Sequence, residues 1–124
     1  MIDITFNGEH LDIASIEQFG QALDRFDQAA NFEVWLATSA GPSMCMLRNQ
    51  SNAWLMYLRN AEDSGFTSLG DSSRSGLASY TLGNGQIDEY PLAWCIDVEQ
   101  GYKALAYFFA NEGARPEWVV WHES

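Results

Sequence analysis

Residues that could carry chemistry are few and dispersed in this 124-residue chain. His10 and His122 lie near opposite ends of the sequence, and no spaced metal-ligand pattern surrounds either of them. Cys45 sits inside an apolar run, where a thiolate is disfavoured, and no GxSxG elbow surrounds any serine. The sequence therefore predicts no metal site, no cofactor and no nucleophilic catalysis.

Two pairs of adjacent carboxylates, Asp88-Glu89 and Glu62-Asp63, remain as candidates for acid-base chemistry. Neighbouring side chains of a strand point to opposite faces, so Asp88 and Glu89 cannot converge on one substrate without a bulge. We therefore expect no enzyme. The alternative that these residues leave open is a small hydrolase with Asp88 or Glu89 as its general base.

The charge balance bears on partners. Seventeen acidic residues against six basic ones give a net charge of −11 at pH 7. This charge repels nucleic-acid phosphates and anionic lipids, and it raises the encounter rate with a positively charged protein. We expect a basic protein partner, no direct binding to nucleic acid and no binding to membranes.

Several features predict a cytoplasmic location. Asp3 and Asn7 interrupt any apolar leader, and no apolar run approaches the roughly 20 residues of a membrane span. Cys45 and Cys95 lie far apart without a metal or redox spacing, so we expect two buried free thiols and no disulfide framework.

The first half of the chain predicts a strand, a helix and a meander. Residues 2–6 alternate apolar and polar side chains before an Asn-Gly turn, and Ser15 and Gln18 resemble a capping box ahead of a helix over residues 16–29. Short β-prone runs at 32–36, 44–47 and 53–58 follow and favour antiparallel pairing. The polar stretch 60–76 is interpreted as one long surface loop.

The second half predicts a hairpin, a helix and a final strand. Residues 77–82 and 86–90 flank Gly83-Asn84-Gly85, a sequence typical of a tight hairpin turn. This segment lacks the Lys and the following helix of a phosphate-binding loop. Asp97 caps a helix expected over 98–111, and 118–121 forms the last strand. This order predicts a single α+β domain over residues 1–124, with two helices packed on a mainly antiparallel sheet.

The aromatic residues suggest an interface. The chain contains five tryptophans and five tyrosines, and both residue types are enriched at protein interfaces. We expect about two-thirds of them to lie inside the protein, with Trp35, Trp118 and Trp121 in apolar strands. Tyr90 and Trp94 are expected to be exposed. The acids that cluster with aromatic residues complete the predicted partner-binding surface, which consists of Glu62, Asp63, Phe66, Asp71, Asp88, Glu89, Tyr90 and Trp94.

Several segments, in this order, carry a family resemblance. They are 54–59 (WLMYLR), 65–68 (GFTS), 84–91 (NGQIDEYP) and the tail with Val98-Glu99, Ala104-Leu105, 107–109 (YFF), Arg115-Pro116 and 118–122 (WVVWH). Together they resemble the immunity-protein family numbered first among those of bacterial polymorphic toxin systems. The match covers about the last 70 residues well and the first 50 loosely.

The resemblance implies a non-enzymatic antitoxin that binds a cognate toxin and protects the cell that makes both. The resemblance implies that family members are often encoded beside toxins of the nucleic-acid deaminase type, whereas toxin domains are exchanged freely in such systems. The acidic and aromatic residues favour a target that acts on DNA or RNA, a deaminase or nuclease, whose active site this protein covers. A small ligand-binding or scaffold module is the alternative. The oligomeric state is left open.

Overall fold

The structure is a computed structural model that describes residues 2–124, and in that range it contains two α-helices and ten strands. The helices are α1 (Ile16–Phe26) and α2 (Val98–Ala110), and a short 3-10 helix, η1, covers Leu92–Trp94. The strands are β1 (Ile2–Phe6), β2 (Glu9–Leu11), β3 (Asn31–Thr38), β4 (Ser43–Asn49), β5 (Asn52–Leu58), β6 (Phe66–Leu69), β7 (Leu77–Thr81), β8 (Ile87–Pro91), β9 (Ile96–Asp97) and β10 (Val120–Glu123). The α+β class predicted from the sequence is confirmed.

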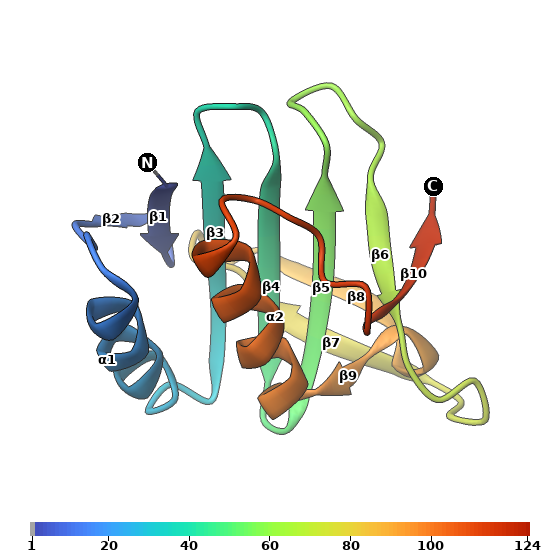
Figure 1. Cartoon of the computed structure of the whole chain (residues 1–124). Helices are drawn as coiled ribbons and strands as arrows, with labels where there is room; N and C mark the ends of the chain where they lie inside the picture. Colours follow the sequence, from blue (N-terminus) through green and yellow to red (C-terminus); the bar gives the residue numbers. More distant parts are fainter. Residues whose placement is uncertain (1) are drawn as a thin grey trace.

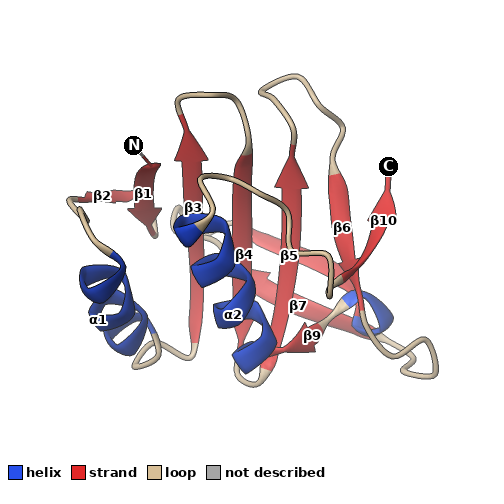
Figure 2. Ribbon diagram, viewed as in Figure 1, coloured by secondary structure: helices blue, strands red, loops and turns tan. Residues whose placement is uncertain are grey.

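Eight of the strands form one antiparallel sheet. Its order is β10-β6-β5-β4-β3-β1-β2, and β9 pairs with β5 beside that path. The strands β7 and β8 form a separate two-stranded sheet. Both helices lie on one face of the large sheet, which we call the front face, and the β7–β8 hairpin lies behind the other, the back face (Figures 1 and 2). The molecule therefore has three layers.

The main core fills the space between the front face and the helices. Phe32, Val34 and Leu36 alternate along β3 and are fully buried, as a period of two requires for a strand with one covered face. Phe19 of α1 and Phe108 of α2 meet this surface and are fully buried as well. Each such side chain contributes about 1.5–3 kcal/mol by leaving water.

A smaller second core lies between the back face and the hairpin. Leu47 and Trp54 of the sheet pack with Ala78 and Tyr80 of β7. The thiol of Cys95 lies 2.8 Å from the hydroxyl oxygen of Tyr80 in a buried hydrogen bond. Cys45 belongs to the same core, and both cysteines are buried and free, which confirms the expectation of two buried thiols.

The helix starts follow the capping signals in the sequence. The Ser15 hydroxyl accepts a hydrogen bond from the backbone N–H of Gln18, and Asp97 accepts one from Glu99. Helix α1 ends at Phe26, three residues before the predicted end. Arg48 Nη1 donates to the main-chain carbonyls of residues 27 and 29, which would otherwise accept bonds from a further helical turn.

The hairpin of residues 77–91 is confirmed, with Leu77 opposite Pro91 and Thr81 opposite Ile87. In its turn, Gly85 has a φ of 89°, which supplies the left-handed conformation expected of the Asn-Gly pair. Neither helix in residues 2–124 is long and apolar enough to cross a membrane.

The prediction of one surface loop over 60–76 is wrong, because it contains β6, which pairs with both β5 and β10. Ser68 explains how polar residues form a buried strand. Its hydroxyl accepts from the Leu55 N–H and donates to the Trp94 carbonyl, so the side chain is fully buried without losing hydrogen bonds.

The prediction that Trp118 belongs to a core strand is also wrong. The strand β10 begins at Val120, and Trp118 lies in the preceding turn with 48% of its surface exposed. Trp35 and Trp121 do lie in strands and are half-buried. Trp121 packs against the main core and donates from Nε1 to the carbonyl of Pro116.

Candidate partner-binding surface

The back face of the sheet and the β7–β8 hairpin enclose a groove of about 190 Å³, which we call the back-face groove. The residues that line it come from β3, β4, β5, β8 and the turn after β7. They are Glu33, Trp35, Cys45, Leu47, Trp54, Met56, Leu82, Asp88 and Tyr90. Small-molecule sites usually enclose about 300–1,000 Å³, so this groove has the size for a protein side chain rather than a cofactor.

Strand register places the floor of the groove. Trp35 pairs with Cys45, and Cys45 pairs with Met56, so these three side chains stand in one row on the back face. Glu33 lies two residues before Trp35 on the same face, because side chains of a strand repeat every second residue. The hairpin covers one part of this face, and Trp35 and Met56 remain half-exposed beside it.

Glu33 links the floor of the groove to the hairpin. Its carboxylate accepts a hydrogen bond from Trp35 Nε1 at 2.9 Å and another from the backbone N–H of Gly83 at 3.1 Å. A side chain at position 83 would approach backbone atoms of Asn7 to 2.5 Å, so only glycine lets the hairpin turn come this close. The carboxylate and the close approach together fix the turn over the edge of the groove.

Asp88 supplies the second carboxylate of the groove. It accepts hydrogen bonds from Gln86 Nε2 at 2.8 Å and from the Tyr90 hydroxyl at 3.4 Å. Burial, and then the charge of Asp88, raise the pKa of Tyr90 to about 12. Burial also raises the pKa of the Cys45 thiol, and Glu33 and Asp88 raise it further. The floor of the groove therefore lies in a negative field from two carboxylates.

A row of aromatic rings continues from the groove along the back face; we call Trp54, Tyr90, Trp94 and His122 the aromatic row. Successive ring centroids are 4.1, 6.3 and 6.1 Å apart. Trp54 is buried, Tyr90 and Trp94 are half-buried, and His122 is exposed. Both histidines of the chain are exposed, as the sequence suggested, and His10 bonds to Asp12. The row offers a graded apolar surface of the kind that dominates protein interfaces.

The structure brings three of the eight predicted site residues together here, namely Asp88, Tyr90 and Trp94. Tyr90 and Trp94 are less exposed than expected, because the first stacks on Trp54. Glu89 points to the outer face of the hairpin, opposite to Asp88, and it accepts a hydrogen bond from the Ser79 hydroxyl. The expected divergence of Asp88 and Glu89 is thus confirmed.

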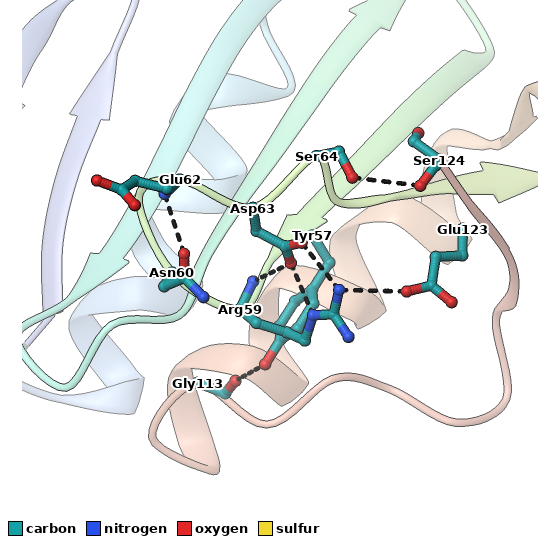
Figure 3. A network of polar contacts seen from close by, with 9 residues as sticks. All are labelled: Tyr57, Arg59, Asn60, Glu62, Asp63, Ser64, Gly113, Glu123 and Ser124. Atoms are coloured by element: carbon teal, nitrogen blue, oxygen red, sulfur yellow. Dashed lines mark hydrogen bonds and ion pairs between the residues drawn. The ribbon is translucent and has the colours of Figure 1, made fainter.

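Asp63 and Phe66 belong to a separate group of contacts around Arg59 at one end of the sheet. Figure 3 shows Asp63 and Arg59 in this group. Asp63 accepts hydrogen bonds from the backbone N–H, Nε and Nη2 of Arg59, at 2.8 to 2.9 Å, and its side chain is 6% exposed. Arg59 also bonds to Glu123, and the hydrogen bonds from Arg59 hold the pKa of Asp63 well below its usual range. The network ties the β5–β6 connection to β10.

Two guanidinium groups contact the Phe66 ring, with the Cζ atoms of Arg59 and Arg115 4.9 and 4.2 Å from its centroid. Such stacking is attractive because the ring face is electronegative. Glu62, in the same connection, is exposed, and its side chain is turned away from Arg59 in Figure 3. Of the two neighbouring acids Glu62 and Asp63, only Glu62 presents a free carboxylate to solvent, because that of Asp63 is bound to Arg59.

Asp71 lies at the opposite end of β6 from Glu62 and Asp63, because the four-residue strand separates them. It forms a local turn by accepting bonds from the N–H and the hydroxyl of Ser73. A strand advances about 3.3 Å per residue, so these acids do not form the single cluster that an uninterrupted loop suggested. The predicted surface is split into several parts of the molecule.

Sequence reasoning missed Glu33, Trp35 and Met56 as candidates for partner contact. A signal was present for the first two, because strict alternation over 32–36 places Glu33 and Trp35 on the face opposite to the buried Phe32 and Val34. For Met56 the run 53–58 is apolar on both faces and shows no alternation. The exposure of Met56 depends on how much of the back face the hairpin covers, which the local sequence does not show.

Catalytic chemistry gains no support from this geometry. No group of three or more His, Cys, Asp or Glu side chains in residues 2–124 is arranged to hold a metal ion. Glu33 and Asp88 are held by neutral donors, and the nearby Cys45 thiol stays protonated because its pKa is raised. The apolar floor, the aromatic row and the two carboxylates without counter-ions make the back face the candidate surface for partner contact.

The family model described as immunity protein Imm1 matches residues 7–123, and this match includes the first part of the chain, where the resemblance read from motifs was loose. No curated protein matches the chain. A family match over nearly the whole chain establishes that the chain belongs to the Imm1 family of immunity proteins.

Proposed function

We propose that this protein is the cytoplasmic antitoxin of a bacterial polymorphic toxin system and neutralises a basic, nucleic-acid-directed toxin, a deaminase or nuclease, by covering its active site. The observation that carries the proposal is the Imm1 family match over residues 7–123. The two buried free thiols are consistent with a reducing compartment.

The net charge of the chain supports a target that acts on nucleic acid. An enzyme that acts on DNA or RNA needs an electropositive cleft to hold the phosphates. A net charge of −11 makes this protein complementary to such a cleft, which speeds association and favours binding over the active site. Inhibition by coverage requires no catalytic group.

The back face supports the mode of binding. The back-face groove and the aromatic row combine buried and half-exposed rings with carboxylates at their margin. Interfaces of standard size bury about 800 Å² per partner and rely on a few aromatic anchors. The surface beside the hairpin supplies such anchors on a rigid sheet.

The test is a titration of the purified protein into the toxin domain encoded beside its gene, with both well above the dissociation constant. We expect toxin activity to fall linearly and to end near an equimolar ratio. Full protection at a hundredfold lower dose would instead show an enzyme acting on the toxin or its product. Addition of EDTA should leave the inhibition unchanged.

A variant pair tests the surface. Trp94→Ala should raise the dissociation constant for the toxin at least about tenfold, as expected for an aromatic anchor. Ile16→Ala, which removes an exposed apolar side chain on α1 at the opposite face of the sheet, should change it less than about twofold. Equal effects of both variants would rule out the back face as the toxin-binding surface.

A further inference from the structure

The carboxylates of the back-face groove lack a counter-ion. Glu33 and Asp88 accept hydrogen bonds from neutral donors only, and neither takes part in an ion pair within residues 2–124. Arg48 and Arg59 are engaged elsewhere, with Asp27 and with Asp63 and Glu123. The negative field over the groove floor is therefore not neutralised by the protein itself.

On these grounds, and resting on the proposed function, we propose that the back-face groove is the anchor site for one arginine side chain of the toxin. The volume of about 190 Å³ suits a single side chain. The apolar lining from Leu47, Met56 and Leu82 matches the aliphatic stem of an arginine. The carboxylates of Glu33 and Asp88 match its charge.

Guanidinium fits this lining better than ammonium does. Its planar group stacks on aromatic faces, here that of the half-exposed Trp35, and offers a fork of donors to carboxylates. Ammonium is a strongly hydrated point charge that does not stack. A second copy of this chain is disfavoured as the occupant because each copy carries a charge of −11.

The experiment uses the full chain and small probes in place of the toxin. N-acetyl-arginine amide, the corresponding lysine amide and the norleucine amide are titrated while NMR follows the indole N–H signals of Trp35 and Trp54. We expect the arginine probe to shift these signals with saturation and to bind more tightly than the other two. No shift, or equal affinity for the norleucine or lysine probe, would overturn the proposal.

A charge-matched variant pair completes the test. Asp88→Asn should weaken binding of the arginine probe about tenfold, which corresponds to about 1.4 kcal/mol. Asp24→Asn, which changes the net charge equally at an exposed site on α1, should have an effect below about twofold. Equal effects would contradict the proposal. Thermal unfolding of both variants checks that the fold is intact.

The same pair, measured with the toxin, separates the two proposals. If the wild-type protein inhibits the toxin at equimolar ratio and Asp88→Asn binds it unchanged, the anchor site is wrong and the proposed function stands. If the arginine probe binds the groove but the toxin is not inhibited, the proposed function fails and the groove remains a guanidinium site.

Discussion

The indole of Trp54 on β5 lies flat against the ring of Tyr90 on β8, with centroids 4.1 Å apart and planes 11° from parallel. This stack joins the hairpin to the back face of the sheet and forms one wall of the back-face groove. Stacked aromatic pairs contribute about 0.5–1.5 kcal/mol beyond the area that they bury. The pair therefore holds together both the third layer of the fold and the candidate site.

Removal of the stack should loosen the hairpin. We expect Tyr90→Ala to lower the free energy of unfolding by about 1–3 kcal/mol, because it removes a half-buried ring from the second core. Tyr90→Phe keeps the ring and should cost less than about 0.5 kcal/mol. Urea unfolding measures both, and a stable Tyr90→Ala variant would show that the stack is not needed.

The raised pKa of Tyr90 predicts a loss of stability in alkali. The tyrosine of the unfolded chain ionises near pH 10, whereas burial and Asp88 raise the pKa of the folded Tyr90 to about 12. The unfolded state therefore loses this proton first, and stability falls as the pH rises from about 10 to 12. The Tyr90→Phe variant should lose less stability over this interval than the wild type.

Asp63 should stabilise the fold above acidic pH. The hydrogen bonds from Arg59 lower its folded pKa below the unfolded value of about 3.9, so its contribution is complete near neutral pH and is lost as the pH falls. We expect Asp63→Asn to be less stable than the wild type at pH 7, with a difference that shrinks below about pH 4. Glu62→Gln, at the exposed neighbouring acid, should follow the wild-type curve.

Replacement of glycine by alanine should have different effects on stability in the two helices. Gly20 of α1 is exposed with open space around it, so Gly20→Ala should stabilise the protein by about 0.5–1 kcal/mol through helix propensity. In α2, a side chain at Gly101 would meet Met46 at 2.7 Å and Ala53 at 3.0 Å. Gly101→Ala should therefore be neutral or destabilising, and equal melting temperatures for the two variants would contradict this packing.

Phe108 should matter more for stability than its neighbour Phe109. Phe108 is fully buried, whereas Phe109 is half-buried in a stack on Phe19. Phe108→Ala should cost about 3–5 kcal/mol, and Phe109→Ala should cost less. The reverse order in urea unfolding would show that α2 is rotated.

Local patterns in the sequence determined most of the elements. Alternation in 2–6, the capping residues Ser15 and Asp97 and the turn glycines around residue 84 act within a few positions of the chain, so they predict structure without knowledge of the fold. The excess of acids and the order of motifs in the second half likewise identified the kind of protein before any contact was known.

Tertiary contacts determined that β6 is a buried strand and which residues come together in the candidate site. The polar Thr67 and Ser68 are buried because β5 and β10 pair on either side of them, and β10 is about fifty residues away. Asp63 is a binding candidate in the sequence but meets Arg59 in the fold. Glu33 and Asp88 share a groove only because the hairpin folds back over β3 to β5. Contacts between distant segments depend on the packing of whole layers, which no local pattern encodes.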